Sequence, residues 1–308
     1  MPNPPTAQSP RVHAGGTFAF GARENLTVSG AINNSGAITF NNGTLSLNTI
    51  TNMGSWDFQT TRDIPASTTY GTLTLSGAVA YTLAGSITCV NLTISNASGT
   101  LDAAGYQINI GGDFSVSGAF TSNGNTVVFD DVSKTSNITV NGASAGTLTF
   151  YNLTCITPSK TLRFDGGDTF VITNTMNLNG QAVNTEIVLN NQADDGSTQF
   201  IFKINTASEP TVYYLDVSNS DVDNTGTQSI NTSNCINRAN NDTITTRCWK
   251  FGLQIDISGY AYSGYGTNGL DTANIVLVKN GTVNTNVNTN SSGYYTFSSI
   301  AFSIGDIM

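Results

Sequence analysis

Short stretches of alternating apolar and polar residues recur along most of the chain, from Asn25 to about Val217. The clearest examples are NLTVSG at 25–30, TLTLSG at 72–77, NLTIS at 91–95, DFSVSG at 113–118 and NITVNG at 137–142. Because successive side chains of a β-strand point to opposite faces, the apolar residues of each stretch share one face and the Thr and Ser residues share the other. Each stretch therefore predicts a short strand with one buried face, closed by a Gly or Asn turn.

A unit this short cannot bury its apolar face alone, so many similar copies in tandem favour stacking against neighbours, as in a solenoid. The predicted strands mostly begin about six to twelve residues apart, which suits two or three strands per irregular coil of a parallel β-helix. We expect one continuous core and almost no helix. The side chains expected in that core are those of Leu26, Val28, Leu73, Leu75, Ile138, Val140, Leu148 and Phe150.

A β-sandwich is the alternative fold. Asn-Gly pairs at 42–43, 123–124, 141–142 and 179–180 are acceptable two-residue hairpin turns. Asn and Gly also suit the left-handed corners of a solenoid, and the many similar units lack the few distinctive core strands of a sandwich. The preferred prediction is therefore an all-β chain with a right-handed parallel β-helix.

Three regions are predicted along the chain. Residues 1–16 hold four of the seven prolines and predict an extended leader. The solenoid is expected over 17–252. Residues 253–308 differ in texture and predict the start of an incomplete β-sandwich module, because complete sandwich domains need about 100 residues. Its open edge is expected to be completed by later strands of a longer protein or by strand addition from a partner in self-assembly.

The amino-acid composition limits the classes of function that we expect. Charged residues make up 10% of the chain and hydrophobic residues 38%, which is typical of a folded all-β protein with a polar, weakly charged surface. The formal net charge is −9 and no basic run occurs, so nucleic acid is not an expected partner. No stretch reaches the roughly 18 to 20 apolar residues of a membrane span.

Two parts of the chain resemble known families. The stretch GTLTFYNLTCITPSKTLRFDGGDTFVITNTMNLNG at 146–180 resembles repeats of large bacterial surface proteins of the parallel β-helix type, akin to filamentous haemagglutinins and autotransporter passengers. VYYLDVSNSDVDNTG at 212–226, followed by CWKF at 248–251, is similar to the closing coils of such repeats. The segment from Ile257, with SSGYYTF at 291–297, resembles the opening strands of carboxypeptidase-regulatory-like or collagen-adhesin B-type modules.

This resemblance implies a non-catalytic stalk, fibre or adhesive segment of a secreted protein at the cell surface. Its implied partners are other surface proteins or cell-surface glycans.

Catalytic chemistry has few candidates. His13 is the only histidine and lies in the predicted leader, so Ser-His-Asp, Cys-His and histidine-zinc sites are not expected. The alternative function is a carbohydrate-active β-helix enzyme, a glycosidase or polysaccharide lyase, that uses paired carboxylates. The candidate carboxylates are Asp130, Asp131, Asp165, Asp168, Asp194, Asp195, Asp216, Asp221 and Asp223. The first six lie at strand ends beside Gly, Ser or Asn, where aspartate commonly caps turns, so a structural role is preferred for them.

One segment is a candidate calcium site. In DVSNSDVDNTG at 216–226, Asp221, Asp223 and Asn224 offer the hard oxygen ligands that Ca²⁺ prefers. Their spacing matches neither an EF-hand loop nor the repeated Gly-Gly-x-Gly-x-Asp pattern. No other cofactor is expected.

The four cysteines occur without a C-x-x-C motif. Cys235 and Cys248 flank a polar loop, and a disulfide between them would stabilise the fold by about 3 kcal/mol and suit an oxidising compartment. Cys89 and Cys155 lie in predicted strands, so we expect them to fill core positions as small apolar side chains.

Overall fold

The computed structural model describes residues 11–12, 17–20, 26–34, 37–40, 45–50, 55–59, 63–66, 69–140, 146–193, 196, 198–251, 253–263 and 269–302. Of the strands up to residue 50, only the backbone is described. Every regular element within these residues is a β-strand, and none of them is helical. The predicted all-β class is therefore confirmed.

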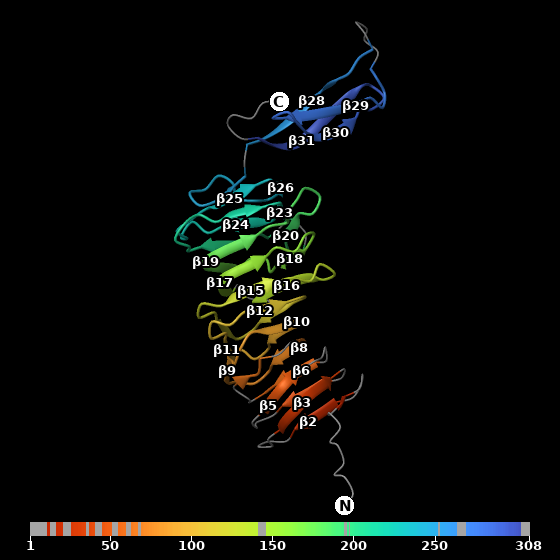
Figure 1. Ribbon diagram of the computed structural model, residues 1–308. Helices are drawn as coiled ribbons and strands as arrows, with labels where there is room; N and C mark the ends of the chain where they lie inside the picture. Colours follow the sequence, from red (N-terminus) through yellow and green to blue (C-terminus); the bar gives the residue numbers. More distant parts are fainter. Residues whose placement is uncertain are drawn as a thin grey trace, which may run out of the picture.

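Strands from β2 (Thr17–Phe20) to β27 (Trp249–Lys250) form a parallel β-solenoid of about nine turns (Figure 1). Successive coils stack in register, so that Leu92 pairs with Leu73 on one side and with Phe114 on the other. The spacing between paired residues of successive coils varies along the axis, from 17 residues between Trp56 and Leu73 to 34 between Asn179 and Tyr213. This variation explains why the sequence has no strict period.

Three stacks of parallel strands make up the walls. The first contains β2, β4 (Ala37–Phe40), β6 (Ser55–Phe58), β8 (Tyr70–Leu75), the second half of β10 (Ile87–Ile94), β13 (Phe114–Val116), β16 (Thr135–Val140), β18 (Thr161–Phe164), β20 (Ile187–Asn191), β23 (Leu215–Ser218) and β26 (Ile236–Ala239). The second contains the first half of β10, β12 (Ile108–Ile110), β15 (Thr126–Phe129), the second halves of β17 (Thr147–Cys155) and β19 (Thr169–Leu178), β22 (Thr211–Tyr213), β25 (Ile230–Ser233) and β27. The third contains β7 (Asp63–Ile64), β9 (Ala80–Leu83), β11 (Thr100–Asp102), β14 (Ala119–Thr121), the first halves of β17 and β19, β21 (Phe200–Ile204) and β24 (Ser220–Val222).

The first coils also hold a separate parallel sheet. It consists of β1 (Arg11–Val12), β3 (Leu26–Asn34) and β5 (Leu45–Ile50). Within the predicted leader, Arg11 and Val12 thus pair with Asn33 and Asn34 of β3. His13 lies outside the described residues.

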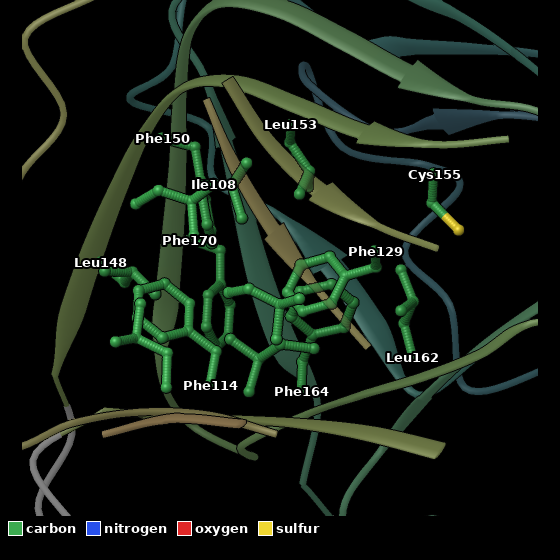
Figure 2. Packing of buried hydrophobic residues seen from close by; sticks show 14 of the residues in the cluster. Ile108, Phe114, Phe129, Leu148, Phe150, Leu153, Cys155, Leu162, Phe164 and Phe170 are labelled. Atoms are coloured by element: carbon green, nitrogen blue, oxygen red, sulfur yellow. The ribbon is translucent and has the colours of Figure 1, made fainter. Parts of the chain in front are cut away.

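The inner faces of the three stacks meet in one continuous hydrophobic core (Figure 2). Six of the eight predicted core residues are buried in it: Leu73, Leu75, Ile138, Val140, Leu148 and Phe150. The side chains of Leu26 and Val28 lie outside the described residues. Because the strands pair in parallel around one core, the β-sandwich alternative is wrong for the solenoid region.

Asparagine and glycine occupy left-handed corners of the coils, as predicted. Asn123 and Gly124 have φ angles of 43° and 83°, and Asn219 and Asn240 have φ angles of 56° and 53°. Asparagine tolerates this region better than other residues with a Cβ atom. The Asn-Gly pairs at 42–43 and 141–142 lie outside the described residues.

The strands after the solenoid are antiparallel. β28 (Leu253–Tyr260) pairs with β31 (Tyr294–Phe302), and β29 (Asn274–Lys279) forms a hairpin with β30 (Thr282–Asn288). They enclose a small core in which Leu277 and Phe297 are buried. These two sheets fit a small partial sandwich, which lies beyond the last coil of the solenoid (Figure 1).

Candidate functional site

The predicted calcium ligands Asp223 and Asn224 follow strand β24 and bind other parts of the chain. Asp223 accepts hydrogen bonds from the backbone N–H (2.7 Å) and Oγ1 (2.9 Å) of Thr225, and one of its oxygens lies 3.7 Å from Lys203 Nζ. Burial acts to raise the pKa of Asp223, but the Thr225 hydrogen bonds and the Lys203 ammonium together outweigh it and hold that pKa below its ordinary value. The Asn224 Oδ1 accepts a hydrogen bond from the Arg247 backbone N–H (2.9 Å).

The third predicted ligand, Asp221, contacts a second carboxyl group, that of Asp242 on the next coil. Asp221 Oδ1 accepts a hydrogen bond from the Val222 backbone N–H (2.7 Å), and its carboxyl group shares a hydrogen bond with Asp242. Burial, opposed by the Val222 hydrogen bond and reinforced by Asp242, raises the pKa of Asp221. Burial also acts to raise the pKa of Asp242, but hydrogen bonds from Thr245 and Ile244 hold it below the ordinary value. One carboxyl group of the pair thus retains a proton to higher pH than the other.

Asp242 was not among the sequence candidates, although a signal for it exists. Asn219 and Asn240 lie 21 positions apart and share a hydrogen bond of 3.2 Å, so they mark equivalent corners of successive coils. Asp221 and Asp242 each follow their corner asparagine by two residues. An Asn-x-Asp motif repeated at the local coil length therefore indicates that the two carboxyl groups stack.

No group of three or more His, Cys, Asp or Glu side chains is arranged to hold a metal ion in the part of the chain that the structure describes. Calcium binding at Asp221, Asp223 and Asn224 stays a prediction. It would require Ca²⁺ to replace both the Lys203 ammonium beside Asp223 and the proton shared by Asp221 with Asp242.

Of the remaining candidate carboxylates near the turns, Asp131 and Asp168 have structural partners. Asp131 accepts hydrogen bonds from the Oγ (2.6 Å) and backbone N–H (2.9 Å) of Ser133, which lower its pKa and cap its own turn, as predicted. Asp168 is buried and accepts a 2.6 Å hydrogen bond from the backbone N–H of Gly146, while burial raises its pKa. Burial likewise raises the pKa of Asp165. Asp194 and Asp195 lie outside the described residues.

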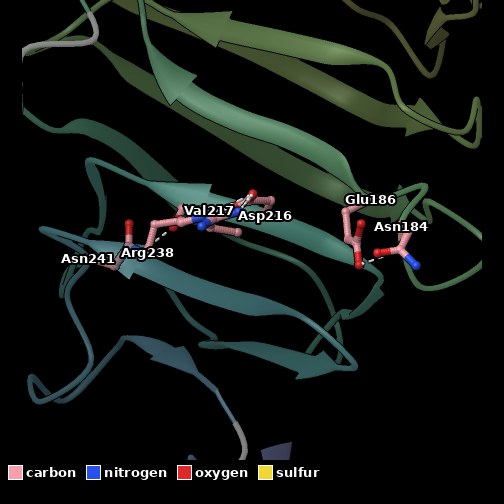
Figure 3. Close-up of polar contacts among 6 residues, drawn as sticks. All are labelled: Asn184, Glu186, Asp216, Val217, Arg238 and Asn241. Carbon is pink, nitrogen blue, oxygen red and sulfur yellow. Dashed lines mark hydrogen bonds and ion pairs between the residues drawn. The ribbon is translucent and has the colours of Figure 1, made fainter. Parts of the chain in front are cut away.

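Asp216 forms an ion pair on the outer face of the first stack (Figure 3). The guanidinium of Arg238, one coil further on, donates from Nε to Oδ1 (2.8 Å) and from Nη2 to Oδ2 (2.8 Å) of Asp216. Close to this pair, Asn241 Nδ2 donates to the carbonyl oxygen of Val217 (2.7 Å). These contacts join β23 to β26 and the residues that follow it.

The predicted disulfide between Cys235 and Cys248 is not formed. The pairing of β25 with β27 places Cys248 beside Ser229, whose Oγ accepts a 3.3 Å hydrogen bond from the Cys248 N–H. Cys235 lies beyond the opposite end of β25 and contacts the Leu215 N–H in the core. At about 3.3 Å per strand residue, the strand keeps the two cysteines further apart than the roughly 7 Å between Cα atoms that a disulfide allows.

Cys89 and Cys155 are buried in the core, as expected. The described residues contain no helix long and apolar enough to cross a membrane. A scan against protein-family models, a search of curated proteins and a search of solved structures each found no match to this chain.

Proposed function

We propose that this chain is a non-catalytic extracellular segment of a bacterial-type cell-surface protein, and that it acts as a stalk, fibre component or adhesive segment. The observation that carries the proposal is the unbroken stack of about nine coils around one core. In a solenoid each coil contacts only its neighbours, so length is gained coil by coil. Such a body suits the task of holding a binding module away from a surface.

The outward residues of the first stack support this role, because they bind one another along the axis. Asn91 Nδ2 donates to Thr72 Oγ1 (3.4 Å), and the Asp113 backbone N–H donates to Asn91 Oδ1 (2.8 Å). Asn137 donates to Asp113 Oδ1 from its backbone N–H (2.9 Å) and from Nδ2 (3.0 Å). Polar groups of this face thus serve cohesion between coils.

The carboxylates also favour the stalk over the alternative enzyme. Glycosidases hold two carboxyl groups about 5 to 9.5 Å apart, so that the scissile bond and, in inverting enzymes, a water fit between them. Asp221 and Asp242 share a hydrogen bond, so they are closer together than the carboxyl groups of either glycosidase geometry. The Asp216 carboxylate is neutralised by the Arg238 guanidinium.

Localisation provides the test. Antibodies raised against the purified chain are expected to label intact cells of the source organism, and surface protease is expected to remove that label. Labelling that requires permeabilised cells would contradict the proposal. In a second arm, the purified chain is incubated with a panel of soluble polysaccharides. Release of new reducing ends that is abolished in Asp221→Asn would establish the enzyme instead.

A further inference from the structure

Three tyrosines gather on one face of the C-terminal sheet formed by β28 and β31. Tyr260 pairs with Tyr294 across the two strands, and their ring centroids lie 5.2 Å apart. The Tyr262 ring is nearly parallel to that of Tyr260, with an interplanar angle of 16° and centroids 6.0 Å apart. The three rings therefore form one continuous aromatic surface.

The tyrosines lie on the outer face of the β28–β31 sheet, and the opposite face contributes to the core of the C-terminal module. Phe297 and Tyr295 pair with Ile257 and Gly259, and their side chains pack on the opposite, inner face. A Cβ atom at Gly259 would lie 2.8 Å from the Tyr295 hydroxyl, so the inner face is closely packed there.

Two of the three outer tyrosines are exposed to solvent. Tyr260 is 55% exposed and Tyr262 is 46% exposed. Large aromatic side chains that are clustered and exposed, without a part in the core, are typical of binding surfaces.

The residue pair beside these tyrosines is neutral. Ser258 pairs with Thr296 two positions from the Tyr260–Tyr294 pair, so period-2 alternation places both on the outer side, and both are exposed. We call Ser258, Tyr260, Tyr262, Tyr294 and Thr296 the tyrosine face. It carries aromatic rings and hydroxyl groups, and none of its five residues is Asp, Glu, Lys or Arg.

We propose that the tyrosine face binds a neutral polysaccharide, an inference that rests on the adhesive function proposed above. A pyranose ring presents C–H groups that pack on an aromatic ring, and its hydroxyls pair with the phenol, Ser and Thr hydroxyls. Nucleic acid bases also stack on tyrosine, but the net charge of −9 opposes their phosphates. An acidic polysaccharide would meet the same repulsion and no basic partner on this face.

The test uses the full chain in affinity gel electrophoresis with soluble neutral polysaccharides: dextran, mannan, xyloglucan and mixed-linkage β-glucan. At least one of these is expected to retard the wild-type chain. The variant Tyr260→Ala/Tyr262→Ala is expected to weaken that binding at least about tenfold, since each stacked ring contributes a factor of this order. Tyr260→Phe/Tyr262→Phe keeps the rings and should retain most of the binding.

A matched control removes two tyrosines of similar exposure from the solenoid. Tyr106 is 41% exposed and Tyr213 is 40% exposed, so Tyr106→Ala/Tyr213→Ala should bind like the wild type. Circular dichroism and melting temperature establish that each variant is folded. Wild-type protein that binds none of the four polysaccharides, or equal loss in the control, would overturn the inference.

Failure of the site and failure of the proposed function are distinguishable. Tyr260→Ala/Tyr262→Ala protein that binds the polysaccharides as the wild type does, on beads that still adhere to cells, would overturn the tyrosine face and leave the adhesive function standing. Polysaccharide binding that depends on the two tyrosines in a chain absent from the cell surface would uphold the site and overturn the function.

Discussion

Lys160 donates a hydrogen bond from Nζ to the carbonyl oxygen of Gly111 at 2.7 Å, although Gly111 lies 49 positions earlier in the chain. The same Nζ donates to the carbonyl oxygens of Asp131 (2.8 Å) and Lys134 (2.7 Å), and the Lys160 side chain is fully buried. An ammonium group has three N–H donors, so each one has a carbonyl partner. Because these residues follow β12, β15 and β17 of the second stack, one side chain joins three successive coils.

Replacing this ammonium is expected to be costly. Lys160→Met keeps the length of the side chain but leaves three carbonyl oxygens without their donor, and the contact with the Gly111 oxygen is buried. We expect the free energy of unfolding to fall by about 3 kcal/mol or more. Lys134→Met, at an exposed position of the same loop, is the matched control and should change stability little. Denaturant unfolding followed by circular dichroism measures both, and equal midpoints for the two variants would contradict the role of Lys160.

The packing of aromatic rings in the core leads to a second prediction. The Phe164 ring lies 4.8 Å from the ring centroids of both Phe170 and Phe200, and all three side chains are buried. Phe164→Ala is expected to lower the free energy of unfolding by about 3 to 5 kcal/mol, through lost burial and the cavity left behind. Tyr151→Ala removes an aromatic ring that is 37% exposed and should cost much less. Thermal unfolding compares the two, and similar melting temperatures would argue against the packing described.

From the Asp221–Asp242 pair we predict that the stability of the protein depends on pH. The raised pKa of Asp221 means that its stabilising contribution is present below the ordinary aspartate pKa of about 3.9 and is lost as pH rises through the raised value. Asp221→Asn can donate to Asp242 at any pH. The variant should therefore match the wild type at low pH and exceed it at pH 7 by an amount on the order of 1 kcal/mol.

The control for this prediction has the opposite sign. The pKa of Asp131 is lowered by its Ser133 hydrogen bonds, so its contribution is present above the ordinary aspartate pKa and is lost as pH falls. Asp131→Asn should therefore be less stable than the wild type at pH 7 and equal to it at low pH. Melting temperatures of the three proteins across this pH range measure the effect, and differences that do not vary with pH would refute the assignment.

Cysteine reactivity is the fourth prediction. Burial raises the pKa of Cys155 and of Cys235 to about 11, and it also raises the pKa of Cys89, whereas Cys248 is partly exposed. Because the thiolate is the reactive form, Cys248 should be alkylated first in the native protein at pH 8, and the others only after unfolding. Mass spectrometry of the alkylated peptides measures the order. A Cys235–Cys248 disulfide-linked peptide in a non-reducing digest would contradict the structure.

Much of the solenoid was predictable because its signal is local. Alternation of apolar and polar residues identifies the buried side chains of strands such as β8 and β16, since neighbouring residues alone determine which face each side chain occupies. The signal weakens in short strands. β7, β11 and β14 contain two or three residues each and were not predicted. Residues 211–218 form two strands, β22 and β23, separated at Tyr214, which has a φ angle of 51°.

By itself, the sequence determined the all-β class, the solenoid, the inward faces of its longer strands and the change of texture near residue 253, because period-2 alternation and turn residues act over only a few positions. The tertiary structure alone decided which residues of different coils meet. The contact of Lys160 with Gly111, the Asp221–Asp242 pair and the separation of Cys235 from Cys248 all depend on coil lengths that range from 17 to 34 residues. Since each loop shifts the register of the next coil, such contacts follow from the summed geometry of several coils.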